Sequence, residues 1–165
     1  MDEVTTPEIQ RIPLEQLCLS VLGMGLNDVI GVLRKTLSPP KTEALKRAMQ
    51  TLKDVGALDD DALSALGRHL AAIPADLRLS KLMVLGSVFG CLSVTLTISS
   101  ILSGRGIFLS PHDKREAATE ARKKFDTGSG DLLTATKAFE VWNALRKDKG
   151  TSAARRWCEE VLRFT

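Results

Sequence analysis

The chain has 165 residues, 44% of them hydrophobic, so it is long and apolar enough for one domain or two small packed ones, which argues against a disordered chain. Tyr is absent and aromatic residues make up only 4%, so the core must consist mostly of Leu, Ala, Val, Ile and Met, which favours helices over strands. The net charge of +3 is too small to identify a partner.

The charge is distributed unevenly along the chain. Residues 1–72 contain eight Lys and Arg against ten Asp and Glu, whereas residues 73–165 contain fifteen against ten. The second part is the better candidate for an anion-binding face, although an ordinary solvated surface also fits this balance. The three cysteines are far apart and no CxxC is present, which argues against a disulfide framework or a zinc site and favours a reducing compartment.

The first elements predicted from the sequence are a linker and two short helices. Residues 1–7 are mostly polar and end in Pro, as a linker would. Apolar residues at helical spacing predict a helix over 14–22. A second helix is expected to begin after Asn27 or Asp28 as its cap and to run to Leu37, where a Ser-Pro-Pro sequence breaks the chain.

The next elements complete the outline of a winged helix. An apolar stripe predicts a helix over 41–55 that Gly56 ends. Two short apolar pieces flank an acidic turn within 56–64, which predicts a small hairpin. Ser64 is placed to cap a further helix over 65–73. Three helices, a hairpin and a fourth helix make up a winged-helix module.

The remaining residues are predicted to be entirely helical. Residues 77–90 and 94–102 are apolar enough to be buried nearly all round, and a charged helix over 112–125 would turn Ala117, Ala118, Ala121 and Phe125 inward. Asp131 is expected to cap a helix that reaches Leu145, and an amphipathic helix with Trp157 closes the chain. The predicted fold class is therefore mainly α, a winged-helix module followed by a helical bundle.

One uncharged stretch could instead span a membrane. Residues 82–102 carry no charge over a length that suits a bilayer, and Gly86 and Gly90 form a GxxxG pair. Six Ser and Thr residues dilute this stretch, so a buried helix pair that is broken near Gly90 explains it better.

The sequence contains no recognisable catalytic site. A GxxxxGK[ST] phosphate loop, a DExH string, a GxSxG elbow and an HExxH helix are all missing. Asp59, Asp60 and Asp61 lack the spacing of a calcium loop and fit a solvated turn. His69 and His112 fit ordinary structural positions. We therefore expect no catalytic residue, no cofactor and no metal in this chain.

A basic cluster in the second part is the remaining candidate for a binding site. Interleaved Glu116 and Glu120 favour a salt-bridged, solvated face, whereas the functional alternative is a groove wall that contacts phosphates. The candidate phosphate-binding residues are Lys114, Arg115, Arg122, Lys123, Lys124, Lys137, Arg155 and Arg156, which become candidate RNA contacts through the resemblance described next.

Several sequence motifs, in order, resemble the region that follows the motor domains of DEAH-box RNA helicases. The segment TPEIQRIPLEQLCL (6–19) resembles the start of that region, and Ser-Pro-Pro (38–40) resembles its Asp-Pro-Pro. The segments GALD (56–59) with LSALGRHLA (63–71) and IPADLRLSKLM (73–83) resemble its next two motifs. The match continues through residues 89–92, 96–98, 108–111, 113–115, 130–131 and 157–158.

The resemblance implies a winged-helix domain over 8–72 and a helical, ratchet-like domain over 73–165. In the family these domains pack on two RecA-like motor domains, which hold ATP and magnesium, and help to close a channel for single-stranded RNA. RNA, the RecA-like domains of the same parent chain and further proteins of a translation or RNA-processing complex are then the expected partners. The sequence motifs are most similar to those of the cytoplasmic branch of the family, which acts on mRNA and in translation. We therefore expect a cytoplasmic location, with a nuclear one as the alternative.

The sequence departs from the family in two places. Residues 130–139 lack the His, Asn and Tyr of the family's usual motif, so an RNA contact through that His or Asn does not carry over. No counterpart of the oligonucleotide-binding barrel follows, so we expect the ratchet-like domain to be truncated at its C-terminus. The alternative function is a protein-interaction scaffold without direct RNA contact.

Overall fold

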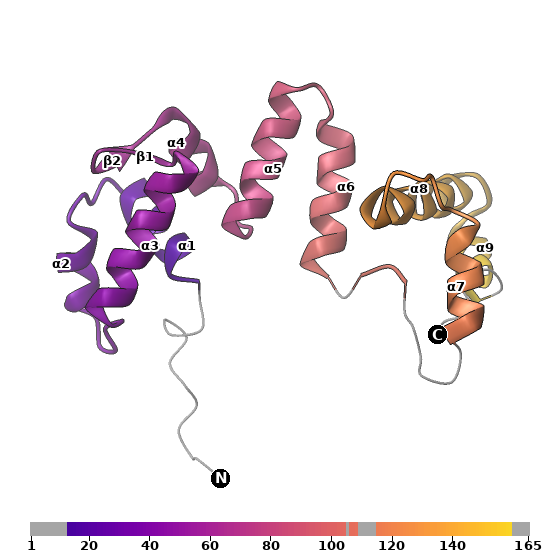
Figure 1. Cartoon of the computed structure of the whole chain (residues 1–165), viewed down its shortest axis with the longest axis horizontal. Coiled ribbons are helices and arrows are strands. Elements are labelled where there is room, and N and C mark those ends of the chain that lie inside the picture. The colour runs from indigo at the N-terminus through magenta and orange to yellow at the C-terminus, as the bar shows by residue number, and fades with distance from the viewer. Residues whose placement is uncertain (1–12, 105, 109–114, 160–165) are drawn as a thin grey trace, which may run out of the picture. The chain divides into compact units, whose positions relative to one another are not determined.

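The computed structural model describes residues 13–104, 106–108 and 115–159. Contacts divide the chain into two compact units, of which the first ends at Val88 and the second begins at Phe89. The described residues are mainly helical, and the first unit adds a two-stranded sheet, which confirms the predicted fold class (Figure 1). None of the described helices combines the length and the apolar character needed to cross a membrane.

Three helices form the base of the first unit. They are α1 (Leu14–Gly23), α2 (Val29–Arg34) and α3 (Thr42–Val55), and α1 packs against α3. Apolar side chains of these helices and of the helix after the hairpin fill the core, where Leu19, Leu45, Leu52 and Leu70 are fully buried. Asp28 caps α2 as predicted, because its Oδ1 accepts from the amide of Gly31 at 2.9 Å.

Helix α2 is shorter than the sequence predicted. It ends at Arg34 rather than at Leu37. The hydroxyl of Thr36 donates to the carbonyl of Leu33 at 2.8 Å, and this bond occupies a carbonyl that a longer helix would use. The two prolines at 39 and 40 then exclude helical backbone before them.

The predicted hairpin forms the wing. Strands β1 (Leu58–Asp59) and β2 (Ala62–Leu63) pair antiparallel, with Leu58 opposite Leu63. Asp60 has a φ of 53°, a left-handed conformation that Asp tolerates in tight turns. The acidic turn is exposed, as the sequence indicated, and Asp61 forms an ion pair with Lys53 of α3 at 3.1 Å.

Ser64 joins the wing to α3 and to α4 (Ala65–Ala72). Its Oγ accepts from the amide of Gly67 at 2.9 Å, which confirms the predicted N-cap, and donates to the carbonyl of Gly56 at 2.7 Å. Gly56 ends α3 with a φ of 82°, a conformation that costs least for glycine. One hydroxyl therefore ties together the end of α3 and the start of α4.

Helix α5 (Leu77–Val88) belongs to the first compact unit. Leu77 is buried in the core of that unit, and Lys81 Nζ donates to the carbonyl of Val55 at 2.7 Å. The lysine thus binds one of the last carbonyls of α3, which have no partner within the helix. The domain boundary proposed after residue 72 stays a prediction.

The second unit consists of α6 (Leu92–Ser103), α7 (Arg115–Lys123), α8 (Asp131–Lys149) and α9 (Thr151–Trp157). Helix α8 packs against both α6 and α9. Phe125 and Ala138 are buried at its core, and Trp157 packs edge-on against Phe125 with 5.8 Å between ring centroids. Ala121 and Phe125 face inward as predicted, whereas the side chains of Ala117 and Ala118 lie outside the described residues.

Three predictions about these helices are wrong. Residues 77–90 and 94–102 are not buried on nearly all sides. The side chains of Val88 and Phe89 are 74% and 77% exposed, because α5 and α6 each bury side chains along only one stripe of the helix. Asp131 is the first residue of α8 and not its cap, since its carboxylate pairs with Arg122. Helix α8 also continues past Leu145 to Lys149, and its last-turn cations favour this extension.

Candidate nucleic-acid interface

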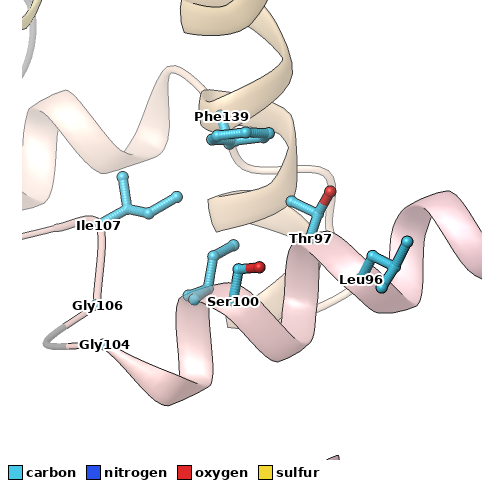
Figure 2. Close-up of a pocket in the computed structure, with 8 residues that line it drawn as sticks. Leu96, Thr97, Ser100, Gly104, Gly106, Ile107 and Phe139 are labelled. Carbon is cyan, nitrogen blue, oxygen red and sulfur yellow. The ribbon is translucent and has the colours of Figure 1, made fainter. Parts of the chain in front are cut away.

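Three adjoining hollows in the second unit form a groove along α6, the loop after it, α7 and the start of α8. The first hollow, of about 350 Å³, is apolar and is shown in Figure 2. Its lining residues are Leu96, Thr97, Ser100, Ile101, Gly104, Gly106, Ile107 and Phe139. In Figure 2, Ile107 and Phe139 lie across the hollow from Ser100 of α6.

The middle hollow connects the apolar end of the groove to a charged end. Its volume is about 380 Å³. Four residues line both this hollow and the first one, namely Ile101, Gly104, Gly106 and Ile107. It also shares Arg122 and Asp131 with the third hollow, of about 440 Å³. We call the three together the α6–α8 groove. One end is thus apolar and the other carries charged side chains.

Arg122 is held at the charged end by two contacts. Its Nη2 forms an ion pair with Asp131 Oδ1 at 2.7 Å, and its guanidinium carbon lies 5.6 Å from the ring centroid of Phe108. Phe108 in turn packs against Phe125, with 6.3 Å between centroids. A guanidinium stacked on an aromatic ring keeps donors free for a second anion.

Lys123 also lines the charged end of the groove, but it is engaged locally. Its Nζ lies 2.7 Å from Glu120 Oε1, one turn earlier in α7. The hydrogen bond between them lowers the pKa of Glu120 and raises the pKa of Lys123. Both side chains are fully exposed, so this pair fits the salt-bridged, solvated alternative.

The other predicted RNA-binding residues whose side chains the structure describes do not line the groove. Lys137 and Arg155 form exposed ion pairs within their own helical segments, at 3.6 Å with Glu140 and 3.5 Å with Glu159. Lys124 and Arg156 are exposed and have no ion-pair partner among the residues the structure describes. Lys114 and the side chain of Arg115 lie outside the described residues. Of the eight candidates, the groove contains Arg122 and Lys123.

The sequence did not single out the apolar half of the groove. Ile107 and Phe139 meet there although 32 positions separate them in the chain. Phe139 also packs against Trp142, with 5.7 Å between ring centroids, and Arg146 lies 5.1 Å from the Trp142 ring. The glycines at 104 and 106 were the available signal, because they allow a loop to pass close to α6.

The sequence and the described residues lack the usual features of a nucleotide or metal site. The charged end of the groove carries two acids beside its two cations, and the sequence has no glycine-rich phosphate loop. Within 13–104, 106–108 and 115–159, no three His, Cys, Asp or Glu side chains gather as metal ligands would.

Two family models match adjacent parts of the chain. The winged-helix helicase-associated (HA2) model matches residues 48–75, and the ratchet-like helicase-associated (HA2) model matches residues 76–135. The second match includes most of the residues that line the α6–α8 groove. Both matches agree with the order of elements in the structure.

Similar proteins come from fungi, plants and animals. A protein of Mycosarcoma maydis named as a DEAH-box ATP-dependent helicase is 42% identical over 93% of this chain and 10% of its own length. The DExH-box ATP-dependent RNA helicase DExH3 of Arabidopsis thaliana is 39% identical over 82% of this chain and 12% of its own length. The ATP-dependent RNA helicase DHX29 of Homo sapiens is 31% identical over 94% and 12%.

The chain spans about a tenth of the length of these relatives. The matches confirm the resemblance to the helicase-associated region of DEAH-box ATP-dependent RNA helicases that the motifs indicated. The chain belongs to the helicase-associated (HA2) domain family, with a winged-helix part followed by a ratchet-like part.

Proposed function

We propose that this chain is the accessory RNA-guiding region of an ATP-dependent DEAH-box RNA helicase. It packs on RecA-like motor domains, and its α6–α8 groove contacts single-stranded RNA as the strand is unwound. ATP and magnesium would be held by the motor domains, because the sequence of this chain has neither a glycine-rich phosphate loop nor a DExH string. The support from the comparisons is that its relatives are named as ATP-dependent helicases.

One observation carries the proposal: the groove changes along its length from an apolar end to a charged end that Arg122 and Lys123 line. A single strand offers an aromatic base face and a charged phosphate at each nucleotide, so apolar contacts beside a cation suit it. Phe139 and Ile107 would contact a base, and Arg122 would contact a phosphate.

Fluorescence titration of the 165-residue chain with a labelled 10-nucleotide oligouridylate tests the proposal. We expect a dissociation constant of about 0.1 mM or weaker that rises with salt, because contacts to phosphates dominate non-specific binding. Tight binding that does not respond to salt would contradict this. ATP hydrolysis by the chain alone would contradict the division of labour between this chain and the motor domains.

Two opposite substitutions at the same ion pair make the test specific. Arg122→Gln should weaken binding several-fold, whereas Asp131→Asn should strengthen it, because the guanidinium is released from its carboxylate. Lys137→Gln and Glu140→Gln are matched controls in another ion pair on α8, away from the groove. Equal effects at both pairs would mean that RNA responds only to net charge.

The scaffold alternative rests on a different observation. Val88 and Phe89 expose large apolar side chains, as protein-docking surfaces do. If no variant alters RNA binding while substitution of these two residues prevents assembly with RecA-like domains, the chain acts as a scaffold.

A further inference from the structure

Positive charge gathers where α2 meets α3 in the first unit. Residues 34–47 contain five cations and one acid, whereas residues 53–61 contain one cation and four acids. The unit is therefore charged in opposite senses at the two ends of α3. The exposed cations at the first end are Arg34, Lys35, Lys41, Lys46 and Arg47.

A hydrogen bond brings these residues together. Arg34 Nη2 donates to Thr42 Oγ1 at 3.2 Å, so one side-chain bond links the end of α2 to the first turn of α3. Lys41 directly precedes that turn. Arg47 lies five residues after Thr42, which is about 7.5 Å along the helix axis. The exposed cations thus lie in two segments of the chain that this bond links.

The ion pairs leave most of this charge unneutralised. Glu43 is paired with Lys46 at 3.1 Å. Within the part of the chain that the structure describes, Arg34, Lys35, Lys41 and Arg47 have no ion-pair partner; we call these four residues the α2–α3 basic surface. The amino-terminal end of α3, a helix of 14 residues, adds a positive partial charge. The mixed charge that the sequence shows on α3 therefore resolves into a net cationic surface at one end.

We propose that the α2–α3 basic surface binds the phosphate backbone of RNA, as a second contact that is independent of the α6–α8 groove. An acidic protein partner fits less well, because the buried centre of a protein interface is depleted of charged residues such as lysine. Between α2 and α3, Leu37 is the one large apolar residue whose side chain is exposed. Isolated apolar residues of this kind are normal on a surface. Exposed cations without an apolar centre suit phosphates, which bind them without regard to sequence.

Salt dependence of RNA binding tests this contact. The double variant Lys41→Gln/Arg47→Gln would be titrated with a labelled 20-nucleotide oligouridylate between 50 and 200 mM salt. The slope of log affinity against log salt should become less steep by about 1.4, because each lost contact to single-stranded RNA removes about 0.7. Arg34 is left intact, since it holds α2 against α3.

The control variant Lys53→Gln/Arg78→Gln removes the same charge from the same unit. It should leave the slope nearly unchanged, because Lys53 is already paired with Asp61 and Arg78 lies outside the basic surface. An equal change in both variants, or none in either, overturns the proposal. So would binding of labelled polyglutamate that depends on Lys41 and Arg47 while RNA binding does not.

The experiments distinguish failure of the α2–α3 basic surface proposal from failure of the α6–α8 groove proposal. If Arg122→Gln has no effect while Lys41→Gln/Arg47→Gln reduces the slope, the groove proposal fails and the second contact stands. The reverse pattern rejects the second contact alone.

Discussion

Single side chains with two partners define this molecule at the scale of the residue. Arg122 bridges a carboxylate and an aromatic ring, and Ser64 bridges the ends of two helices. The sequence identified both residues, Arg122 as a candidate RNA contact and Ser64 as a cap. It could not identify their second partners, Phe108 and Gly56, because those contacts depend on tertiary packing.

Ser64→Ala should destabilise the first unit by about 1–2 kcal/mol, because it removes an N-cap and leaves a carbonyl of the turn unpaired. Urea unfolding followed by circular dichroism measures the loss. Ser93→Ala, at an exposed position early in α6, is the control and should change stability by less than about 0.5 kcal/mol. Equal losses in both variants would remove the bridging role of Ser64.

At the scale of the element, the periodicity of apolar residues predicted whether a segment is a helix or a strand better than it predicted how far its side chains are buried. The stripe of α3 and the hairpin with its acidic turn came directly from the residue pattern, and both are confirmed. The burial of α5 and α6 was overestimated, because a run of apolar residues does not reveal how many neighbours a helix has. The end of α2 was missed because a single Thr hydroxyl competes for the helix carbonyl.

The buried face of α1 has a chemical consequence at Cys18. Burial, with a smaller contribution from Glu15, raises the pKa of this thiol from 9.0 to about 11. The native state therefore keeps the Cys18 proton between these two pH values, where the unfolded state loses it. The stability that this thiol contributes is present below pH 9 and falls as the pH rises toward 11.

Iodoacetamide at pH 8.5, read by mass spectrometry, tests this burial. Exposed Cys91 should be alkylated within minutes, whereas Cys18 should stay unmodified until the first unit is unfolded in urea. Alkylation of both cysteines at similar rates in the native protein would show that α1 opens readily.

At the scale of the whole molecule, the ordered motifs carried more information than any single pattern. They indicated the family and the mainly helical fold. The groove lay beyond their reach, because its walls come from residues 96–107, 122–131 and 139, which only the folded chain brings together. Charge counting found Arg122 and Lys123 in the charged half of this groove and could not find the apolar half.

The hydrogen bond from Lys81 to the carbonyl of Val55 determines at which residue an isolated winged-helix domain should end. A protein that ends at Ala72 would lose this bond and would uncover the core around Leu77, whereas one that ends at Val88 keeps both. We expect the longer protein to melt cooperatively and the shorter one to melt several degrees lower, as calorimetry would record. Anyone who isolates this module for binding work should therefore retain α5, even though the family models assign it to the ratchet-like part.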